Sequence, residues 1–220
     1  MSHSLNNPRR RLLGAGLAVF GLTSITIATT VQAVTLTPRQ SRGPFYPTAL
    51  PLDKDNDLIY VAGRNGIAKG EIANVVGRVV DDRGRPVDRA RVEIWQCDAH
   101  GRYHHSRDRR NVPLDENFQG YGQSFSDAEG GYRFRTIKPV AYPGRAPHIH
   151  FAISGPDFEP LVTQMYVAGA PENARDFLLN SVSDPTARQQ LLVPFTETNA
   201  AGELVGRFDI VLAADGRFSG

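Results

Sequence analysis

The stretch Lys138–Phe151 reads KPVAYPGRAPHIHF, and it decides how the rest of the chain is interpreted. A single residue, Ile149, separates its two histidines, His148 and His150. Side chains alternate between the two faces of a strand, so on a strand both imidazoles would share one face and Ile149 would lie on the other. Three prolines precede the pair and predict a stiff, extended loop that runs into this strand. The stretch therefore predicts half of a metal site at the start of a strand.

The histidine pair also has a simpler interpretation. Histidines at alternate positions of a strand are often just polar residues on a solvated face, and the spacing alone does not decide between the two. Tyr142 and Arg145 lie within the same short stretch, which favours a functional site. The remaining ligands would have to come from elsewhere in the chain. Cys97 is the only cysteine, so it can form no disulfide within the chain and no cysteine-based zinc or iron–sulfur site.

The composition and the turn signals predict an all-β fold. The 220 residues include 21 glycines and 15 prolines, which favours turns and strands over helices. A turn at residues 81–86 suggests that the runs before and after it form a hairpin. Alternating or apolar runs predict strands at Ala73–Val80, Ala90–Trp95, Tyr132–Arg135, His148–Ile153, Leu161–Val167 and Arg207–Leu212.

Two segments have helical composition. They are Glu172–Leu179 and Pro185–Leu192, the second with Asp184 as its N-cap. Many short strands with few helices predict an antiparallel β-sandwich, with an irregular N-terminal segment and one or two short helices. The length suits one domain, which we expect to span residues 34–220.

Residues 1–33 have the composition of an export signal. Arg9 and Arg10 precede an uncharged run, Leu12–Ala33, whose last three residues resemble a signal-cleavage site. The arginine pair predicts export by the twin-arginine route, to the periplasm or the exterior. The alternative is a membrane anchor, because the run approaches a spanning length, although threonines and glycines dilute it.

The charge balance argues against nucleic acid as a partner. The net charge is +2, from 25 basic and 23 acidic residues, and residues 1–33 contain no acid. Without the three arginines Arg9–Arg11, the 23 acidic residues outnumber the remaining basic ones by one. No basic field is left to attract a polyanion.

Four motifs, taken in order, resemble those of the intradiol ring-cleavage dioxygenases. They are WQCDAHGRY at 95–103, FRTIKPVAYPGRAPHIHFAISGP at 134–156, VTQMY at 162–166 and RFDIVL at 207–212. GPFYP at 43–47 also resembles the N-terminal segment of that family. The resemblance runs from about Asn74 to about Leu212. It implies an enzyme that uses O2 to cleave a catechol-type aromatic diol between its hydroxylated carbons, giving a muconate-type diacid.

The same resemblance implies one non-haem Fe(III) per chain, held by Tyr103, Tyr142, His148 and His150. Anionic oxygen ligands suit this hard ion, and two phenolates with one hydroxide would neutralise its charge in a buried site. Contact with the ion would lower the phenol pKa far below its usual value of about 10. Each tyrosine taken alone has the alternative role of a core or rim aromatic. Three histidines near Tyr103 are rival ligands that we interpret as a polar loop: His100, His104 and His105.

Further residues match the family by motif. The resemblance implies that Arg145 and Gln164 stabilise negative charge that develops on the ring, that Tyr142 leaves the metal and takes up a substrate proton, and that Trp95 lines the pocket. The alternatives are a surface loop charge for Arg145, an outward-facing strand residue for Gln164 and core packing for Trp95. Gly144 stands where the nearest relatives carry a bulky aromatic residue, which opens the pocket and leaves the identity of the diol open.

The sequence offers two alternatives to this interpretation. Residues 77–92, GRVVDDRGRPVDRARV, have a hairpin pattern that is common in exported, non-enzymatic β-sandwich binding modules, but that pattern does not explain the tyrosines and histidines. Iron sites with two histidines and one carboxylate need a nearby acid, and the first acid after His150 is Asp157. The partners expected are a small aromatic diol and O2, with no nucleic acid, no stable membrane insertion after signal cleavage, and either homo-oligomerisation or a second subunit.

Overall fold

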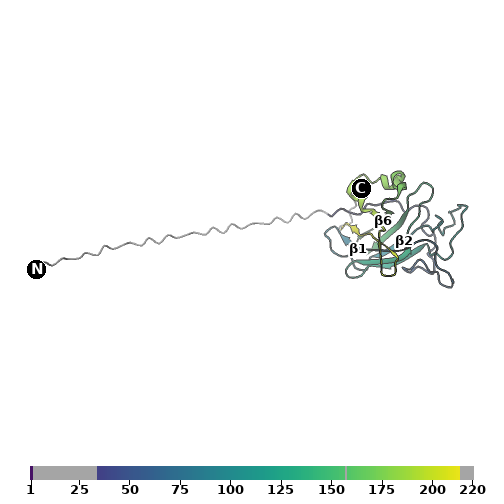
Figure 1. The fold of residues 1–220 in the computed structure, drawn as a ribbon, viewed down its shortest axis with the longest axis horizontal. Coiled ribbons are helices and arrows are strands. Elements are labelled where there is room, and N and C mark those ends of the chain that lie inside the picture. The colour runs from purple at the N-terminus through teal and green to yellow at the C-terminus, as the bar shows by residue number, and fades with distance from the viewer. Residues whose placement is uncertain (2–33, 157, 214–220) are drawn as a thin grey trace. The chain divides into compact units, whose positions relative to one another are not determined.

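The computed structural model describes residue 1, residues 34–156 and residues 158–213. The expected signal segment lies outside the described residues and stays a prediction. The described chain forms ten strands in two sheets, with three short helical segments (Figure 1). The strands are β1 (Ile72–Asp81), β2 (Arg91–Trp95), β3 (Tyr121–Phe125), β4 (Gly131–Ile137), β5 (His148–Gly155), β6 (Phe158–Val167), β7 (Leu192–Val193), β8 (Glu197–Thr198), β9 (Leu204–Arg207) and β10 (Ile210–Leu212).

The predicted β-sandwich is confirmed, although its sheets are not antiparallel throughout. One sheet has the order β10-β1-β9-β8, with β4 also paired to β1, and the other has the order β3-β2-β5-β6-β7. Both sheets are mixed, because β1 pairs in parallel with β9 and β10, and β6 pairs in parallel with β7. Parallel neighbours need long connections, and here the strands that join β1 come from the far end of the chain.

The predicted hairpin between Ala73–Val80 and Ala90–Trp95 is wrong. The turn itself forms, with the Gly84 N–H donating to the Asp81 carbonyl at 2.9 Å. However, β1 belongs to the first sheet and β2 to the second, where β2 pairs with β3 and β5. Turn chemistry is local, whereas the sheet that a strand joins depends on which distant strands cover its apolar face.

The glycine within β1 is required by a close backbone approach. A Cβ atom at Gly77 would lie 1.9 Å from the carbonyl oxygen of Phe208, which is far inside contact distance. The Phe208 N–H donates to the carbonyl of Val76 at 2.9 Å, so the link between β9 and β10 lies directly against β1. Glycine inside a strand often marks such an approach.

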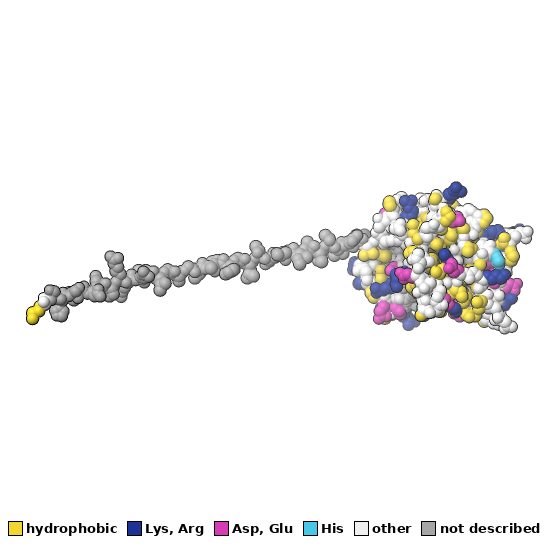
Figure 2. Space-filling model, viewed as in Figure 1, with side chains coloured by type: hydrophobic (Ala, Val, Ile, Leu, Met, Phe, Trp, Pro, Cys, Tyr) yellow, Lys and Arg dark blue, Asp and Glu magenta, His cyan; other side chains and the backbone are white. Residues whose placement is uncertain are grey.

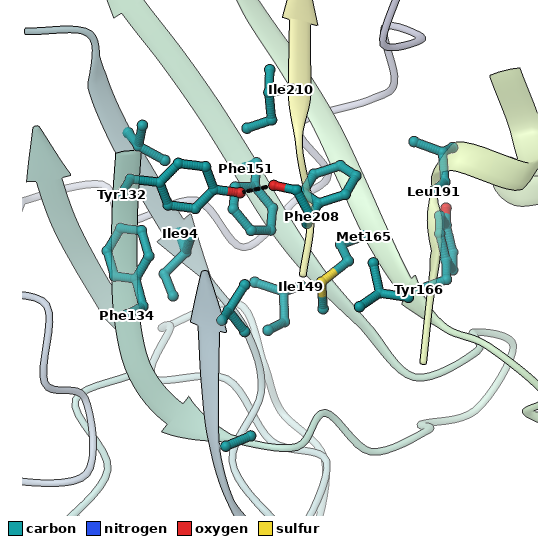
Figure 3. Packing of buried hydrophobic residues seen from close by; sticks show 14 of the residues in the cluster. Ile94, Tyr132, Phe134, Ile149, Phe151, Met165, Tyr166, Leu191, Phe208 and Ile210 are labelled. Atoms are coloured by element: carbon teal, nitrogen blue, oxygen red, sulfur yellow. Dashed lines mark hydrogen bonds between the residues drawn. The ribbon is translucent and has the colours of Figure 1, made fainter. Parts of the chain in front are cut away.

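The two sheets bury one apolar core between them. Phe151 of β5 packs against Tyr132 and Phe208, with ring centroids 6.2 Å and 5.0 Å away (Figure 3). The buried hydroxyl of Tyr132 donates to the carbonyl of Phe208 at 2.5 Å, so its polar end is satisfied. Ile149 joins this core and is fully buried. Because Ile149 and Phe151 face the core, the alternate residues of β5 are turned to its opposite face.

The helical predictions are met in part. Helix α2 (Pro185–Gln190) begins as predicted, because the Asp184 side chain accepts a hydrogen bond from the Thr186 N–H at 2.8 Å. The predicted helix Glu172–Leu179 is instead a 3-10 helix (Pro171–Arg175) followed by α1 (Phe177–Asn180). The break falls at Asp176, whose backbone is extended and whose carboxylate caps α1. This break turns the carboxylate of Asp176 toward the loop that carries Arg145.

The surface carries no single-sign field on the face that Figure 2 shows, where acidic and basic side chains are interspersed. This agrees with the balanced charge of the chain after its first residues. Within residues 34–156 and 158–213, none of the helices is both long and apolar enough to cross a membrane.

Candidate metal centre

Strand β5 brings the two imidazoles together. Both histidines are 1% exposed and lie on the face opposite Ile149, as the period of two predicts. The Nε2 atoms of His148 and His150 are 3.3 Å apart. His148 Nδ1 lies 2.6 Å from the carbonyl of Ala146, which can only accept, so Nδ1 carries the proton and Nε2 presents its lone pair. The interpretation of the pair as polar residues on a solvated face is therefore wrong.

Tyr103 reaches the same point from the loop after β2. Its hydroxyl lies 3.4 Å from Nε2 of His148, and the residue is 3% exposed. The loop is held by Asp108, whose buried carboxylate accepts a hydrogen bond from the Tyr103 N–H at 2.7 Å. The ring of Phe45 stacks on that of Tyr103 with centroids 4.7 Å apart. The phenol oxygen therefore points at the histidines from a fixed backbone.

Tyr142 enters through a tight turn. The Arg145 N–H donates to the carbonyl of Tyr142 at 2.9 Å, and Gly144 has a φ of +85°. Proline followed by glycine at the two central positions is the sequence that a type II turn requires, so Pro143 and Gly144 have a structural reason to be there. The Tyr142 ring centroid lies 5.8 Å from that of Tyr103 and 5.5 Å from that of His148. The four side chains that the family resemblance singles out thus form one cluster.

Burial sets the protonation of this cluster. It lowers the pKa of His148 to about 3, helped by the charge of Arg145, and lowers the pKa of His150 well below its usual range. Both imidazoles are therefore neutral at pH 7 and have lone pairs to give. Burial also raises the pKa of Tyr103 and of Tyr142, although the Arg145 charge opposes the shift at Tyr142. The protein alone keeps both phenols protonated, so a bound cation would have to ionise them.

The donor set fits a trivalent iron. Within residues 34–156 and 158–213, no three side chains of His, Cys, Asp or Glu are grouped to hold a metal. A metal bound by His148 and His150 would therefore need the tyrosine oxygens, which are hard and anionic when ionised. Two phenolates in a buried site would also supply two of the three negative charges that neutralise Fe(III), and a hydroxide would supply the third.

Arg145 lies at the edge of this cluster and is held from two sides. Its side chain is 10% exposed, so it is not the surface loop charge that the sequence left open. Nε donates to Asp176 at 2.9 Å, and Nη2 donates to the side-chain oxygen of Gln164 at 2.5 Å. Asp176 also accepts a hydrogen bond from the Ala146 N–H at 2.9 Å. The guanidinium is therefore preorganised beside the tyrosines and histidines.

Gln164 faces inward. It lies opposite His150 in the pairing of β6 with β5 and is fully buried, so the outward-facing alternative is wrong. Its amide nitrogen donates to the carbonyl of Ser41 at 3.0 Å. Nearby, a Cβ atom at Gly43 would lie 3.2 Å from Cε1 of His150. The irregular N-terminal segment thus runs closely over His150.

Trp95 supports the histidine ring. It lies opposite His150 in the pairing of β2 with β5, and the two rings stack with centroids 4.8 Å apart and planes at 5°. The indole is 1% exposed and belongs to a small aromatic cluster with Tyr103 and Tyr121. Packing on His150 therefore explains why a tryptophan stands at position 95. Its role in lining the substrate pocket stays a prediction.

The rival histidines lie apart from the cluster. His104 Nε2 lies 2.8 Å from the carbonyl of Asp115, and His105 Nδ1 accepts a hydrogen bond from the backbone of Arg107. His100 is exposed in a turn. His104 and His105 thus bond to the local loop, which agrees with the polar loop that the sequence predicts.

Two charged residues near the cluster do not follow from the sequence analysis. Asp176 lies inside the segment predicted as a helix, although an acid before an apolar run is a recognised N-cap signal. Arg110 lies in a run of charged residues that gives no signal of its own. Its guanidinium pairs with Asp108 and lies 4.5 Å from the ring centroid of Tyr142. Its Nη1 atom is buried and finds no hydrogen-bond partner among the described residues.

Comparison with known proteins shows the family to which the chain belongs. Residues 41–214 match the family model described as "Dioxygenase". The chain is 46% identical to the protocatechuate 3,4-dioxygenase beta chain of Burkholderia cepacia, over 72% of this chain and 71% of that one. It is 32% identical to a hydroxyquinol 1,2-dioxygenase of Corynebacterium glutamicum, over 78% of this chain, and spans 62% of that relative's length.

A solved structure of similar fold is the dioxygenase domain of a dioxygenase carbohydrate-binding protein fusion from Streptomyces sp. SirexAA-E. The identity is 29%, the TM-score is 0.64, and the match covers 82% of this chain and 99% of that one. Catechol 1,2-dioxygenase from Acinetobacter sp. ADP1, at 24% identity and a TM-score of 0.63 over 84% of this chain and 66% of that one, shares the fold. The chain is an enzyme of the intradiol ring-cleavage dioxygenase family.

Proposed function

We propose that the protein is a non-haem Fe(III) dioxygenase that cleaves a catechol-type aromatic diol between its hydroxylated carbons to a muconate-type diacid. One observation carries the proposal. Nε2 of His148 lies 3.4 Å from the Tyr103 hydroxyl and 3.3 Å from Nε2 of His150 in a buried site, although Tyr103 comes from a separate part of the chain. With Tyr142 they form the four-ligand set for one iron per chain.

Each residue of the site has a definite task in this reaction. When bound, Fe(III) would draw electron density from the diol ring and make it reactive toward O2. Tyr142 is half-buried, unlike Tyr103, and its oxygen, ionised when the metal is bound, would be the base that takes up a substrate proton. Arg145, fixed by Asp176 and Gln164, supplies positive charge where negative charge develops on the ring.

The names of the relatives suggest the substrates to test first. Protocatechuate and hydroxyquinol appear in those names, and catechol in that of a solved structure. We expect purified protein to contain about one iron per chain, to be red-brown from tyrosinate-to-iron charge transfer, and to consume O2 with at least one of the three diols. Active protein that contains zinc or no metal would contradict the proposal.

The structure removes the evidence for the alternative, a non-enzymatic binding module. Its evidence was a hairpin pattern at residues 77–92, and the strands on either side of that turn belong to different sheets. Membership of an enzyme family also disfavours it. This alternative would be supported again only if the purified protein were colourless and bound no diol.

We propose that the enzyme works as an oligomer or with a second subunit. The support is the name of the Burkholderia cepacia relative, which is called a beta chain. Light scattering of the purified protein gives the mass in solution, and a monomer that is fully active would contradict the proposal.

Arg110 offers a first prediction. Arg110→Met should lower the free energy of unfolding by about 1–2 kcal/mol, because it leaves the buried carboxylate of Asp108 without its cation and removes the contact with the Tyr142 ring. The loss should be smaller than for a fully buried pair, since the Arg110 side chain is 24% exposed. Urea unfolding of the metal-free protein measures it.

The neighbouring arginine supplies a matched control for this prediction. Arg109 is exposed, so Arg109→Met should change the unfolding free energy by less than about 0.5 kcal/mol. If the two substitutions lowered the unfolding free energy equally, Arg110 would have no particular role in stabilising Asp108.

Export is a separate proposal that rests on Arg9 and Arg10. We propose the twin-arginine route to the periplasm or exterior, which carries folded proteins and so suits a protein that loads its metal first. Replacing both residues with lysine should keep the precursor in the cytoplasm, because recognition depends on the guanidinium pair. Fractionation followed by immunoblotting tests this, and unchanged export would indicate the general secretory route.

A further inference from the structure

A large cleft opens beside the proposed metal centre. Its volume is about 710 Å³, and it lies between the Tyr142–Arg145 turn and the 3-10 helix Pro171–Arg175. Tyr142 and Arg145 both line it, so it is continuous with the residues that would hold and activate a diol. A substituent on the side of a bound diol that faces Tyr142 and Arg145 would therefore have this cleft beside it.

The size of the cleft exceeds what a single ring needs. Pockets of roughly 300–1,000 Å³ enclose drug-sized ligands, which are several times larger than a ring with two hydroxyl groups. The lining is chiefly apolar, with Pro143 on one wall and Pro171 and Ala174 on the other. Such walls favour an apolar group over water.

The small residues of the walls keep the cleft open. A Cβ atom built at Gly144 would meet nothing within 4 Å, so the space beside the turn is empty of protein. The φ of +85° at this position disfavours any larger residue, because left-handed backbone strains a side chain. Ala174, on the other wall, is exposed and small.

The charges around the cleft offer little to a charged substituent. Arg145 is paired with Asp176 at 2.9 Å, and the carboxylate of Asp176 is fully buried. Glu172 and Arg175 are exposed neighbours of opposite sign on the 3-10 helix, so their fields oppose each other. Apart from Arg145, which is assigned to the reacting ring, the cleft offers a carboxylate or amine on the substrate no unopposed partner.

We propose that the preferred substrate is a catechol whose ring carries a bulky, uncharged and largely apolar substituent, such as a second aromatic ring, which lies in this cleft. This inference rests on the proposed function and names its substrate class. Gly144 and Ala174 are then residues that determine specificity, because side chains of normal size at these positions would fill the space.

The test compares 4-phenylcatechol with catechol. In the iron-loaded wild-type enzyme, kcat/KM for 4-phenylcatechol should equal or exceed that for catechol. Ala174→Trp fills the cleft without straining the backbone and should lower the ratio of the two kcat/KM values by about tenfold or more. Anaerobic titration calorimetry with 4-phenylcatechol gives a second measure, in which the variant should bind correspondingly more weakly.

A matched control uses the same substitution away from the cleft. Ala200 is exposed in the turn before β9, so Ala200→Trp should leave the ratio unchanged. An enzyme that cleaves catechol but rejects 4-phenylcatechol would overturn the inference, as would an Ala174→Trp variant with the wild-type ratio; in both cases the proposed function stands. If iron-loaded protein cleaves neither of these diols nor any other catechol, the proposed function itself fails.

Discussion

Replacing His148 with alanine is expected to remove most of the iron, the colour and the ring-cleavage activity together. Its Nε2 atom lies 3.3 Å from Nε2 of His150 and 3.4 Å from the Tyr103 hydroxyl, so it stands between two other proposed ligands. Residues that merely orient a ligand contribute about 10–100-fold to metal affinity, and loss of a ligand should cost more than that. Iron content per chain after dialysis, with the visible spectrum, measures the loss.

A second variant separates ligation from packing. Tyr103→Phe keeps the ring that stacks on Phe45 and the N–H that binds Asp108, and removes only the hydroxyl. It should fold with near wild-type stability as metal-free protein and still lose iron and colour. His100→Ala is the control, because His100 is exposed and should leave iron binding unchanged. Full iron content in both His148→Ala and Tyr103→Phe would contradict the assignment.

The histidine pair shows what local sequence can predict. Alternation along a strand depends only on backbone geometry, so one apolar residue between two histidines was enough to place both on one face. The N-cap at Asp184 could also be predicted from the sequence. An acidic residue followed by proline favours the start of a helix through local interactions alone. The positions of Tyr103 and Tyr142 came from family resemblance, since nothing in their local sequence distinguishes a ligand from a core aromatic.

Pairings between distant strands were beyond local reasoning. Strand β3 has the unpromising sequence YGQSF because its Gly122 is crossed by another segment: a Cβ atom there would lie 2.5 Å from the carbonyl oxygen of Asp55. A close backbone approach also explains why β1 contains Gly77. The hairpin prediction failed because β1 and β2 pair with distant strands in different sheets. The role of Asp176 could not be predicted locally, because its partner Arg145 comes from another part of the chain. Its neighbours in the sequence have the composition of a helix.

The second large effect is expected when Arg145 is replaced: the turnover rate should fall while the iron is retained. An arginine cation does not ligate Fe(III), so Arg145→Ala should keep the metal and the colour. Preorganised charge stabilisation is worth roughly 3–4 kcal/mol, so kcat should fall about a hundred- to a thousand-fold. Arg145→Lys should recover only part of the rate, because an ammonium does not reproduce the planar fork that binds Asp176 and Gln164 together.

The structure adds a complication that a double variant resolves. Removing Arg145 leaves the buried carboxylate of Asp176 unpaired, which should also cost about 3–5 kcal/mol of stability. Adding Asp176→Asn removes that stranded charge and keeps an oxygen to cap α1, since asparagine is an equally good N-cap. The double variant should therefore regain most of the stability while its turnover stays low. If turnover recovers together with stability, Arg145 only holds the loop between Tyr142 and His148 in place. If turnover stays low while stability recovers, the guanidinium acts on the reacting ring.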